Sequence, residues 1–249
     1  MEIYLLSFLS VVVVSLISLI GILILIISDR LLSKVIFSLM SLSVGALFAG
    51  VFLYLIPESE IFKTEPEVGA LLILAGILFF FCLEKFLHWK HSHHLPSEKG
   101  IKPLGFINLI ADGFHNFIDG LIIGAAFLID VNVGLVATVA IIFHEIPQEL
   151  GDFGVLIYSG FSKFKALAFN LLSASLALVG LVLAWFIALY SSWLIEAILP
   201  LAAGGFIYLA GCDLMPELHK VADWKKSLWQ LIMILLGIGI ISIFFFFNH

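Results

Sequence analysis

The fold and function of this chain depend on two short stretches, HNFIDG at residues 115–120 and HEIPQE at residues 144–149. Each lies inside a long apolar segment, where ionisable side chains are costly because a bilayer solvates charge poorly. Such residues at membrane depth usually mark an ion path or a proton relay. Imidazoles, carboxylates and carboxamides are also the ligands of divalent metals of intermediate hardness. The two stretches therefore predict a metal path through a membrane.

The composition around these stretches is that of a polytopic membrane protein. Of the 249 residues, 62% are hydrophobic and only 12% are charged, whereas an average soluble domain has roughly 25% charged residues. A spanning helix needs about 20 mainly apolar residues, and eight segments meet this condition: 3–27, 35–57, 68–88, 104–128, 132–158, 166–190, 193–215 and 228–247. The sequence predicts an all-α fold of eight transmembrane helices, with residues 1–249 forming a single transmembrane transporter domain. Cys82 and Cys212 lie far apart in apolar runs and are expected to be buried.

The basic residues predict the orientation of the helices. Of the twelve lysine and arginine residues, all but Lys63 fall on connections at one side of the predicted topology: 30, 34, 85, 90, 99, 102, 163, 165, 220, 225 and 226. Because cytoplasmic connections are enriched in basic residues, this side should be cytoplasmic and both termini extracytoplasmic. The connection 88–103 is then cytoplasmic. Its histidines His91, His93 and His94 form a candidate metal-binding loop, for which a solvated loop without metal is the equal alternative.

A short internal similarity indicates an inverted repeat. GALFAGVFLYLIPE at 45–58 and GGFIYLAGCDLMPE at 204–217 share four of fourteen positions and close on the same Pro-Glu pair. The second and seventh helices of an eight-helix chain run in opposite directions, as in the inverted repeats of many transporters. Similar apolar composition is the alternative explanation of this match.

Helical geometry places the polar residues of the fourth and fifth helices on two surfaces that should face each other. Side chains three or four positions apart share a helix face, which groups Asp112, His115, Asn116 and Asp119 on one helix. On the other helix, the corresponding stripes contain His144 with Gln148, and Glu145 with Glu149 and Asp152. Pro147 should kink this helix, since it leaves the carbonyl of Phe143 without its usual partner. Asp112 and Asp152 are candidates for supporting the ligands or lining the path, and a structural role at the helix ends explains them equally well.

These residues resemble the paired signature of the ZIP (Zrt-, Irt-like) metal transporter family, and the following Gly151-Asp152-Phe153 resembles its LIV-1 branch. The resemblance covers essentially the whole chain. It implies transport of divalent metal, chiefly zinc, toward the cytosol, through a binuclear site between the fourth and fifth helices. It assigns the first metal position to His115, Asp119, His144 and Gln148, and the second to Asn116, Glu145 and Glu149, with Asp119 able to bridge. A homodimer is expected only from this resemblance.

The chain departs from the LIV-1 pattern at two places. Gln148 stands where those members usually have His. A carboxamide is a harder and weaker ligand than imidazole, so we expect affinity or selectivity to shift from zinc toward iron or manganese. Val51 and Tyr54 stand where the second helix of those members often has Asp and His. The long histidine-rich extracellular domain of many animal members is not present, which leads us to expect a minimal member in the plasma (inner) membrane of a prokaryote.

The sequence favours a carrier over other classes of metal protein. It has no phosphate-binding loop of GxxxxGK[ST] form, and the expected mechanism is alternating access by rocking of one helix bundle against another. Zinc is the expected substrate, and iron, manganese and cadmium are left open. We expect no cofactor and no enzymatic activity. The expected partner is the lipid bilayer, and no nucleic acid is expected. An intramembrane metalloprotease is the main rival, but its HExxH motif is broken by Gln148. A cation-diffusion exporter lacks the paired motif, and a metal sensor without transport stays open.

Overall fold

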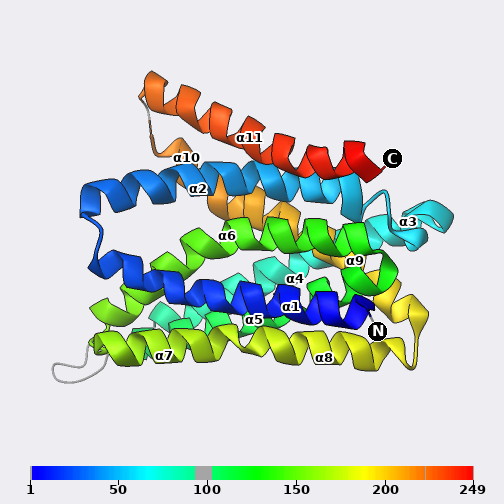
Figure 1. Cartoon of the computed structure of the whole chain (residues 1–249), viewed down its shortest axis with the longest axis horizontal. Helices are drawn as coiled ribbons and strands as arrows, with labels where there is room; N and C mark the ends of the chain where they lie inside the picture. The colour runs from blue at the N-terminus through cyan, green and yellow to red at the C-terminus, as the bar shows by residue number, and fades with distance from the viewer. Residues whose placement is uncertain (1, 93–102, 222, 249) are drawn as a thin grey trace.

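The structure, a computed structural model, describes residues 2–92, 103–221 and 223–248, which form an all-α bundle without a strand (Figure 1). The first half of the chain contains α1 (Glu2–Ile17), η1 (Ser18–Leu25), α2 (Asp29–Gly50), η2 (Val51–Leu55), α3 (Glu60–Thr64), α4 (Pro66–Ser92) and α5 (Pro103–Ile129). The second half contains α6 (Val131–Tyr158), α7 (Lys163–Ala174), α8 (Leu176–Ala188), α9 (Ser192–Tyr208), η3 (Leu209–Leu214), α10 (Met215–His219) and α11 (Trp224–Asn248). Here η1 is a 3₁₀ segment, whereas η2 and η3 are π-helical.

Eight segments of the described chain are long and apolar enough to cross a membrane, which confirms the predicted number. They are Glu2–Leu25, Arg30–Leu55, Pro66–Leu83, Leu104–Ile129, Val131–Tyr158, Lys163–Ala188, Ser192–His219 and Trp224–Ile243. Four of them join more than one element: α1 with η1, α2 with η2, α7 with α8, and α9 with η3 and α10. The predicted segments differ from these by only a few residues at their ends.

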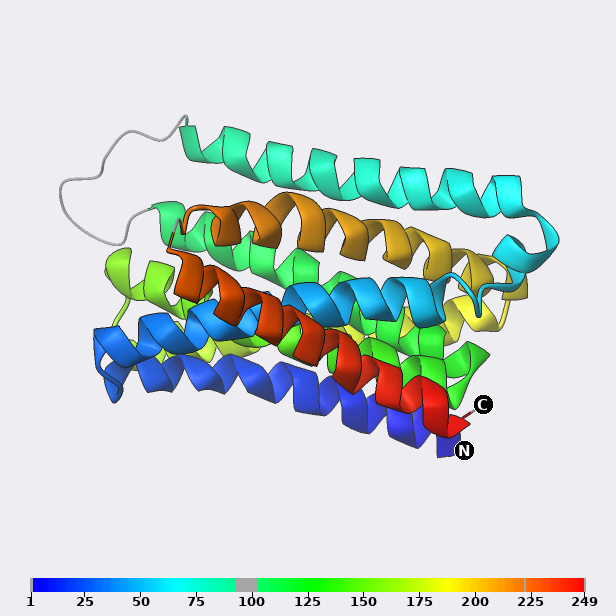
Figure 2. The ribbon, with the colours of Figure 1, turned by 90° about the horizontal axis from the view of Figure 1, so that it is seen from above.

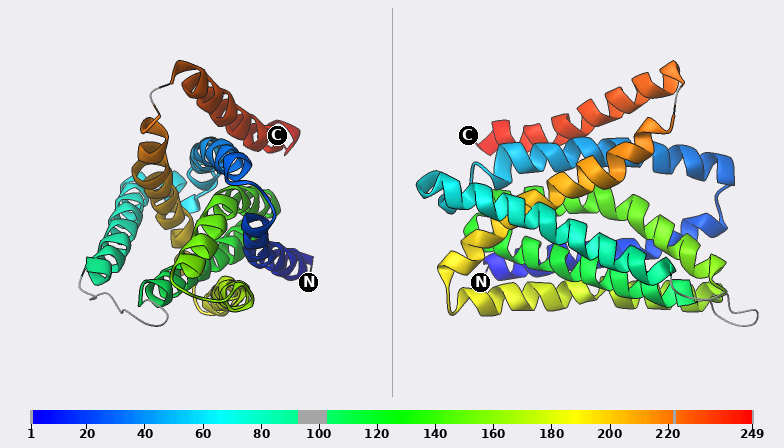
Figure 3. Two further views of the ribbon diagram at one scale, coloured as in Figure 1. Left: turned by 90° about the vertical axis from the view of Figure 1, so that its left-hand side faces the viewer. Right: turned by 180° about the vertical axis from the view of Figure 1, so that it is seen from behind.

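The helices lie roughly along one axis, with both termini and α3 at the same end of the bundle (Figures 1 and 2). The opposite end holds the η1–α2, α6–α7 and α10–α11 connections, and Arg30, Lys163 and Lys220 lie in or next to them in sequence. In the end-on view, α6 lies in the interior of the bundle (Figure 3). It contacts α5, α2, α1 and η1. The helix that carries HEIPQE is therefore enclosed by other helices and not by lipid.

Three helix pairs cross so closely that their backbones touch at glycines. A Cβ atom added at any of these glycines would fall on a backbone carbonyl oxygen of the partner helix. The pairs are Gly45 with Gly237 (α2 and α11), Gly76 with Gly204 (α4 and α9), and Gly120 with Gly180 (α5 and α8). Small residues permit such close approach, and dispersion contacts then stabilise the helix pair within a bilayer.

The internal similarity in the sequence is also a similarity of local structure. Gly45 and Gly204 are the first residues of the two matching stretches, and each makes one of these close crossings. A π-helical segment follows in both stretches, η2 after α2 and η3 after α9. The two helices run in opposite directions (Figure 1), as an inverted repeat requires.

The two cysteines do not occupy the places expected from the sequence. Both Cys82 and Cys212 are exposed on the surface of the bundle. In a bilayer, an exposed position on a spanning helix contacts lipid, so a small apolar side chain is stable there without protein neighbours. The expectation that they are buried was wrong because apolar surroundings in sequence do not separate a lipid-facing side from a protein-facing side.

Candidate metal centre

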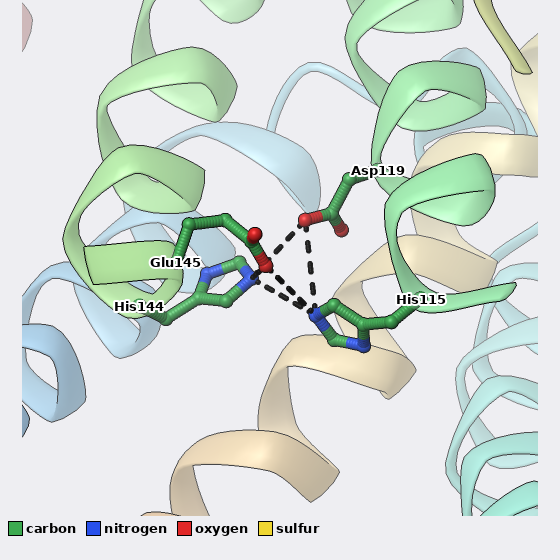
Figure 4. Close-up of side chains that lie close together, drawn as sticks. All are labelled: His115, Asp119, His144 and Glu145. Carbon is green, nitrogen blue, oxygen red and sulfur yellow. Dashed lines mark hydrogen bonds and ion pairs between the residues drawn. The ribbon is translucent and has the colours of Figure 1, made fainter. Parts of the chain in front are cut away.

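Four side chains from two helices converge inside the bundle (Figure 4). His115 and Asp119 come from α5, whereas His144 and Glu145 come from α6. The Nε2 atoms of the two imidazoles are 3.2 Å apart. Asp119 Oδ2 lies 3.2 Å from Nε2 of His144 and 3.8 Å from Nε2 of His115, and Glu145 Oε1 lies 3.6 Å and 3.4 Å from the same two atoms. All four ligand atoms are within 4.8 Å of one another.

These separations are close to those around a tetrahedral metal ion. Zinc binds imidazole nitrogen and carboxylate oxygen at about 2.0–2.2 Å, so that neighbouring ligand atoms of a tetrahedron lie about 3.3–3.6 Å apart. The five separations given above span 3.2–3.8 Å. The four side chains therefore fit one divalent ion with only small movements.

The burial of the carboxylates also favours a cation. Asp119 is 1% exposed and Glu145 is completely buried. Although Glu145 Oε1 faces both imidazoles, neither oxygen of Glu145 accepts a hydrogen bond from the residues that the structure describes. A buried carboxylate without donors is strongly unfavourable unless a proton or a cation compensates its charge. Two buried carboxylates, one of them without a donor among the described residues, form with the two imidazoles a suitable cradle for a divalent cation.

Local contacts orient His144 toward this cradle. Its Nδ1 lies 3.2 Å from the carbonyl oxygen of Ala140, one turn earlier on α6. Because a carbonyl only accepts, this contact favours the tautomer with the proton on Nδ1 and the lone pair of Nε2 toward the other three side chains. The helix itself thus favours the tautomer that can bind a metal.

Pro147 is accommodated by a contact from α2. It leaves the Phe143 carbonyl without an intrahelical donor, and Ser43 Oγ donates to that carbonyl at 2.5 Å. The helix α6 continues through Pro147 without a break. Ser43 therefore satisfies the polar atom that the proline exposes, one residue before His144.

A cavity of about 210 Å³ borders the cluster on one side. Its wall includes His115, Asp112, Gln148, Asp152 and Asp213. A second cavity of about 160 Å³ borders His144 and shares Gln148 and Asp213 with the first. Because Asp112 and Asp152 lie toward the start of α5 and the end of α6, the first cavity extends toward the end of the bundle with the basic connections.

The structure brings together four of the seven predicted metal ligands, and the other three lie around them. Gln148 is partly buried and lines both cavities. Asn116 is fully buried, and its Nδ2 donates to Asp112 Oδ1 at 2.8 Å. Glu149 is also fully buried and accepts from Asn170 at 2.5 Å.

Two further candidates from the sequence, Asp112 and Asp152, are held by hydrogen bonds. Asp112 is 3% exposed and accepts hydrogen bonds from Asn116 and Ser173. Asp152, on the cavity wall, accepts from Asn108 at 3.0 Å. The side chain of His91, and all of His93 and His94, lie outside the described residues.

Several residues around the cluster were missed in the sequence. Ser43 on α2 and Asn170 and Ser173 on α7 all bond to groups of α5 or α6. Asn170 and Ser173 are three positions apart in an apolar segment and therefore share one helix face. This spacing was the feature of the sequence that could have identified Asn170 and Ser173. An isolated Ser or Asn in a spanning helix is otherwise common as a contact between helices.

Comparison with known proteins agrees with the resemblance stated above. A family model described as ZIP Zinc transporter matches residues 90–244. The chain is 36% identical over 228 residues to "Zinc transporter ZIP13" of Pongo abelii, covering 84% of this chain and 66% of the relative. It is 30% identical over 268 residues to human "Zinc transporter ZIP13" (84% and 70% covered) and 37% identical over 167 residues to human "Zinc transporter ZIP6" (64% and 22% covered).

The chain thus spans about two thirds of the ZIP13 proteins and less than a quarter of ZIP6. These relatives are eukaryotic and lend no support to the prokaryotic membrane expected from the sequence. The family model covers more than half of the chain, and its matched region contains both α5 and α6 with the four converging side chains. This chain belongs to the ZIP zinc transporter family.

Proposed function

We propose that this chain carries divalent metal, with zinc as the principal substrate, across a membrane toward the cytosol. The observation that carries the proposal is the buried cluster of His115, Asp119, His144 and Glu145, whose ligand atoms have the spacing of a tetrahedral zinc site. The ZIP13 and ZIP6 relatives are named zinc transporters. A metal that leaves water for this site exchanges its hydration shell for two imidazoles and two carboxylates, which neutralise its double charge.

The position of the cavity supports release at the end with the basic connections. The cavity beside His115 extends toward that end, whereas apolar residues of α5 lie on the other side of the cluster. Ile122, Ile123 and Ala126, which follow Asp119 toward the opposite end, are at most 2% exposed. If the basic connections are cytoplasmic, this arrangement is open to the cytosol and closed toward the other side. Both termini are then extracytoplasmic.

The pattern of helix crossings supports alternating access by two bundles. The close glycine crossings join α5 to α8, α2 to α11 and α4 to α9. The metal cluster belongs to the first of these units, with α6 packed on α5. We propose that α1, α5, α6, α7 and α8 move against α2, α4, α9 and α11, because each of the three close crossings joins two helices of the same group. Such a movement would close the inner cavity and open a path at the other end.

We further propose a second cation position beside the first, as the resemblance implies. Three buried oxygens there, Asn116 Oδ1, Glu145 Oε2 and Glu149 Oε1, accept no hydrogen bond within the described part of the chain. All three atoms are hydrogen-bond acceptors. A cation can therefore bind them, whereas another acceptor group cannot satisfy them. An all-oxygen set is harder than the histidine-containing first position.

Uptake by the purified chain in liposomes tests the proposed function. With zinc outside, we expect saturable uptake above that of empty liposomes, and competition by cadmium, iron and manganese gives the metal preference. Uptake no greater than in empty liposomes would refute the carrier. Cleavage of a helical peptide in the same preparation would instead revive the intramembrane metalloprotease.

The substitution Gln148→His tests whether residue 148 contacts the metal in transit. Gln148 lines both cavities at the cluster, and imidazole is a softer ligand than a carboxamide. We expect the ratio of zinc uptake to manganese uptake to rise several-fold. The matched control is Asn108→His. It adds an imidazole to the wall of the first cavity, at an earlier position on α5 than His115, and should leave the ratio unchanged. An unchanged ratio in Gln148→His would remove residue 148 from the metal path.

A further inference from the structure

Two polar residues of α7 hold carboxylates next to the metal cluster, one on each of its two helices. Asn170 and Ser173 are 0% and 6% exposed. Asn170 Nδ2 donates to Glu149 Oε2 of α6 at 2.5 Å, and Ser173 Oγ donates to Asp112 Oδ2 of α5. A third helix therefore contacts both helices of the metal centre through their acidic side chains.

The contact from Asn170 engages only one oxygen of Glu149. The other oxygen, Oε1, is buried and accepts no hydrogen bond from the described residues. A neutral amide lowers the cost of burying one carboxylate oxygen but does not compensate the negative charge. Glu149 is thus held in place with its other oxygen left to bind a cation.

Asn170 is itself held by the first membrane span. Its Nδ2 also donates to the carbonyl of Ser18 at 3.3 Å, at the point where α1 changes to the 3₁₀ segment η1. Close by, Ser15 Oγ donates to the carbonyl of Ala174 at 3.0 Å, where α7 ends. These contacts set the position of the amide independently of Glu149, so the amide is preorganised to orient that carboxylate.

We propose that Asn170 is a positioning residue for the second cation position: its amide holds Glu149 so that the free carboxylate oxygen binds the ion. The inference rests on the proposed function, because it takes the deep polar site to bind transported metal. The alternative is a purely structural role, in which Asn170 only joins α7 to α6 and η1, as buried amides often do between membrane helices. The two differ in what happens to metal binding when the amide is removed.

The experiment counts zinc ions bound by the purified full chain in detergent, by equilibrium dialysis and elemental analysis. The wild-type chain is expected to bind two ions, and Glu149→Gln one. Asn170→Leu, which keeps the side-chain volume without the amide, should weaken the second ion about 10–100-fold, the usual effect of removing a group that orients a metal ligand. The first ion should bind as in the wild type. If the Leu variant is not monodisperse, Asn170→Ala serves in its place, since alanine suits the interior of α7.

Two further variants separate positioning from a purely structural role. Asn170→Leu combined with Glu149→Gln should bind metal like Glu149→Gln alone, because a residue that acts through Glu149 has no effect once that carboxylate is gone. Asn108→Leu removes another amide that bonds a carboxylate of this region, that of Asp152, and should keep both ions.

The outcomes distinguish this inference from the proposed function. Two ions bound with wild-type affinity in Asn170→Leu would overturn the inference, as would a wild-type chain that binds only one ion. Additive losses in the double variant would overturn it as well. A wild-type chain that neither binds nor takes up zinc would refute the proposed function itself.

Discussion

Asp119→Asn should abolish zinc uptake while leaving the bundle folded. Asp119 is 1% exposed, and its Oδ2 is the atom that approaches both imidazoles, at 3.2 Å from His144 Nε2 and 3.8 Å from His115 Nε2. The substitution keeps the shape of the side chain but removes one of the two negative charges at the cluster. Loss of charge compensation for a dehydrated divalent ion should reduce uptake at least about 100-fold, at the upper end of effects seen when a metal site is altered.

The control for this prediction is the same substitution at Asp130. That residue precedes α6 and accepts hydrogen bonds from the backbone N–H groups of Asn132 and Val133. Asparagine caps helices as well as aspartate does, so Asp130→Asn should take up zinc at the wild-type rate. Liposomes that contain Asp119→Asn and take up zinc like the wild type would remove Asp119 from the metal path.

Gly180→Leu should prevent the chain from folding into a stable bundle. A Cβ at this position falls on the carbonyl oxygen of Phe117, where α8 crosses α5. The obstacle is backbone and not a flexible side chain, so the two helices must separate. Insertion of bulk into a packed contact usually costs about 1–3 kcal/mol and more where the backbone must shift. Phe117 lies between the proposed ligands His115 and Asp119, so the remaining folded protein should also lose zinc uptake.

The matched control here is Gly239→Leu on α11, because a Cβ at Gly239 has no heavy atom within 4 Å. Yield, monodispersity and the midpoint of thermal unfolding in detergent measure both variants. We expect aggregation or a much lower midpoint for Gly180→Leu and wild-type behaviour for Gly239→Leu. Equal midpoints for the two would contradict the close crossing of α5 and α8.

The membrane spans were predictable because length and hydropathy alone define them, but the internal breaks were not. The first span changes from α to 3₁₀ geometry at Ser18, and the sixth is interrupted at Ser175 between α7 and α8. Neither break is marked by proline or glycine. They coincide with contacts between spans, such as Ser15 Oγ to the Ala174 carbonyl, which depend on tertiary packing.

The core of the site was predictable for a different reason. His115 and Asp119 are four positions apart on one helix, and His144 and Glu145 are neighbours on the next, so helical periodicity and a short connection bring them together. The groups that support them come from other helices. Ser43 and Asn170 reach the site from α2 and α7, and a single polar residue in an apolar span does not reveal which neighbour it will face.

We propose above all that His115, Asp119, His144 and Glu145 hold the metal in transit. X-ray absorption at the zinc edge, on purified chain with one equivalent of zinc, tests this claim directly. We expect imidazole nitrogen and carboxylate oxygen at about 2.0–2.2 Å, with the imidazole contribution lost when His115 and His144 are both replaced by alanine. A spectrum that is unchanged in this double variant would mean that zinc binds elsewhere, and it would contradict the claim.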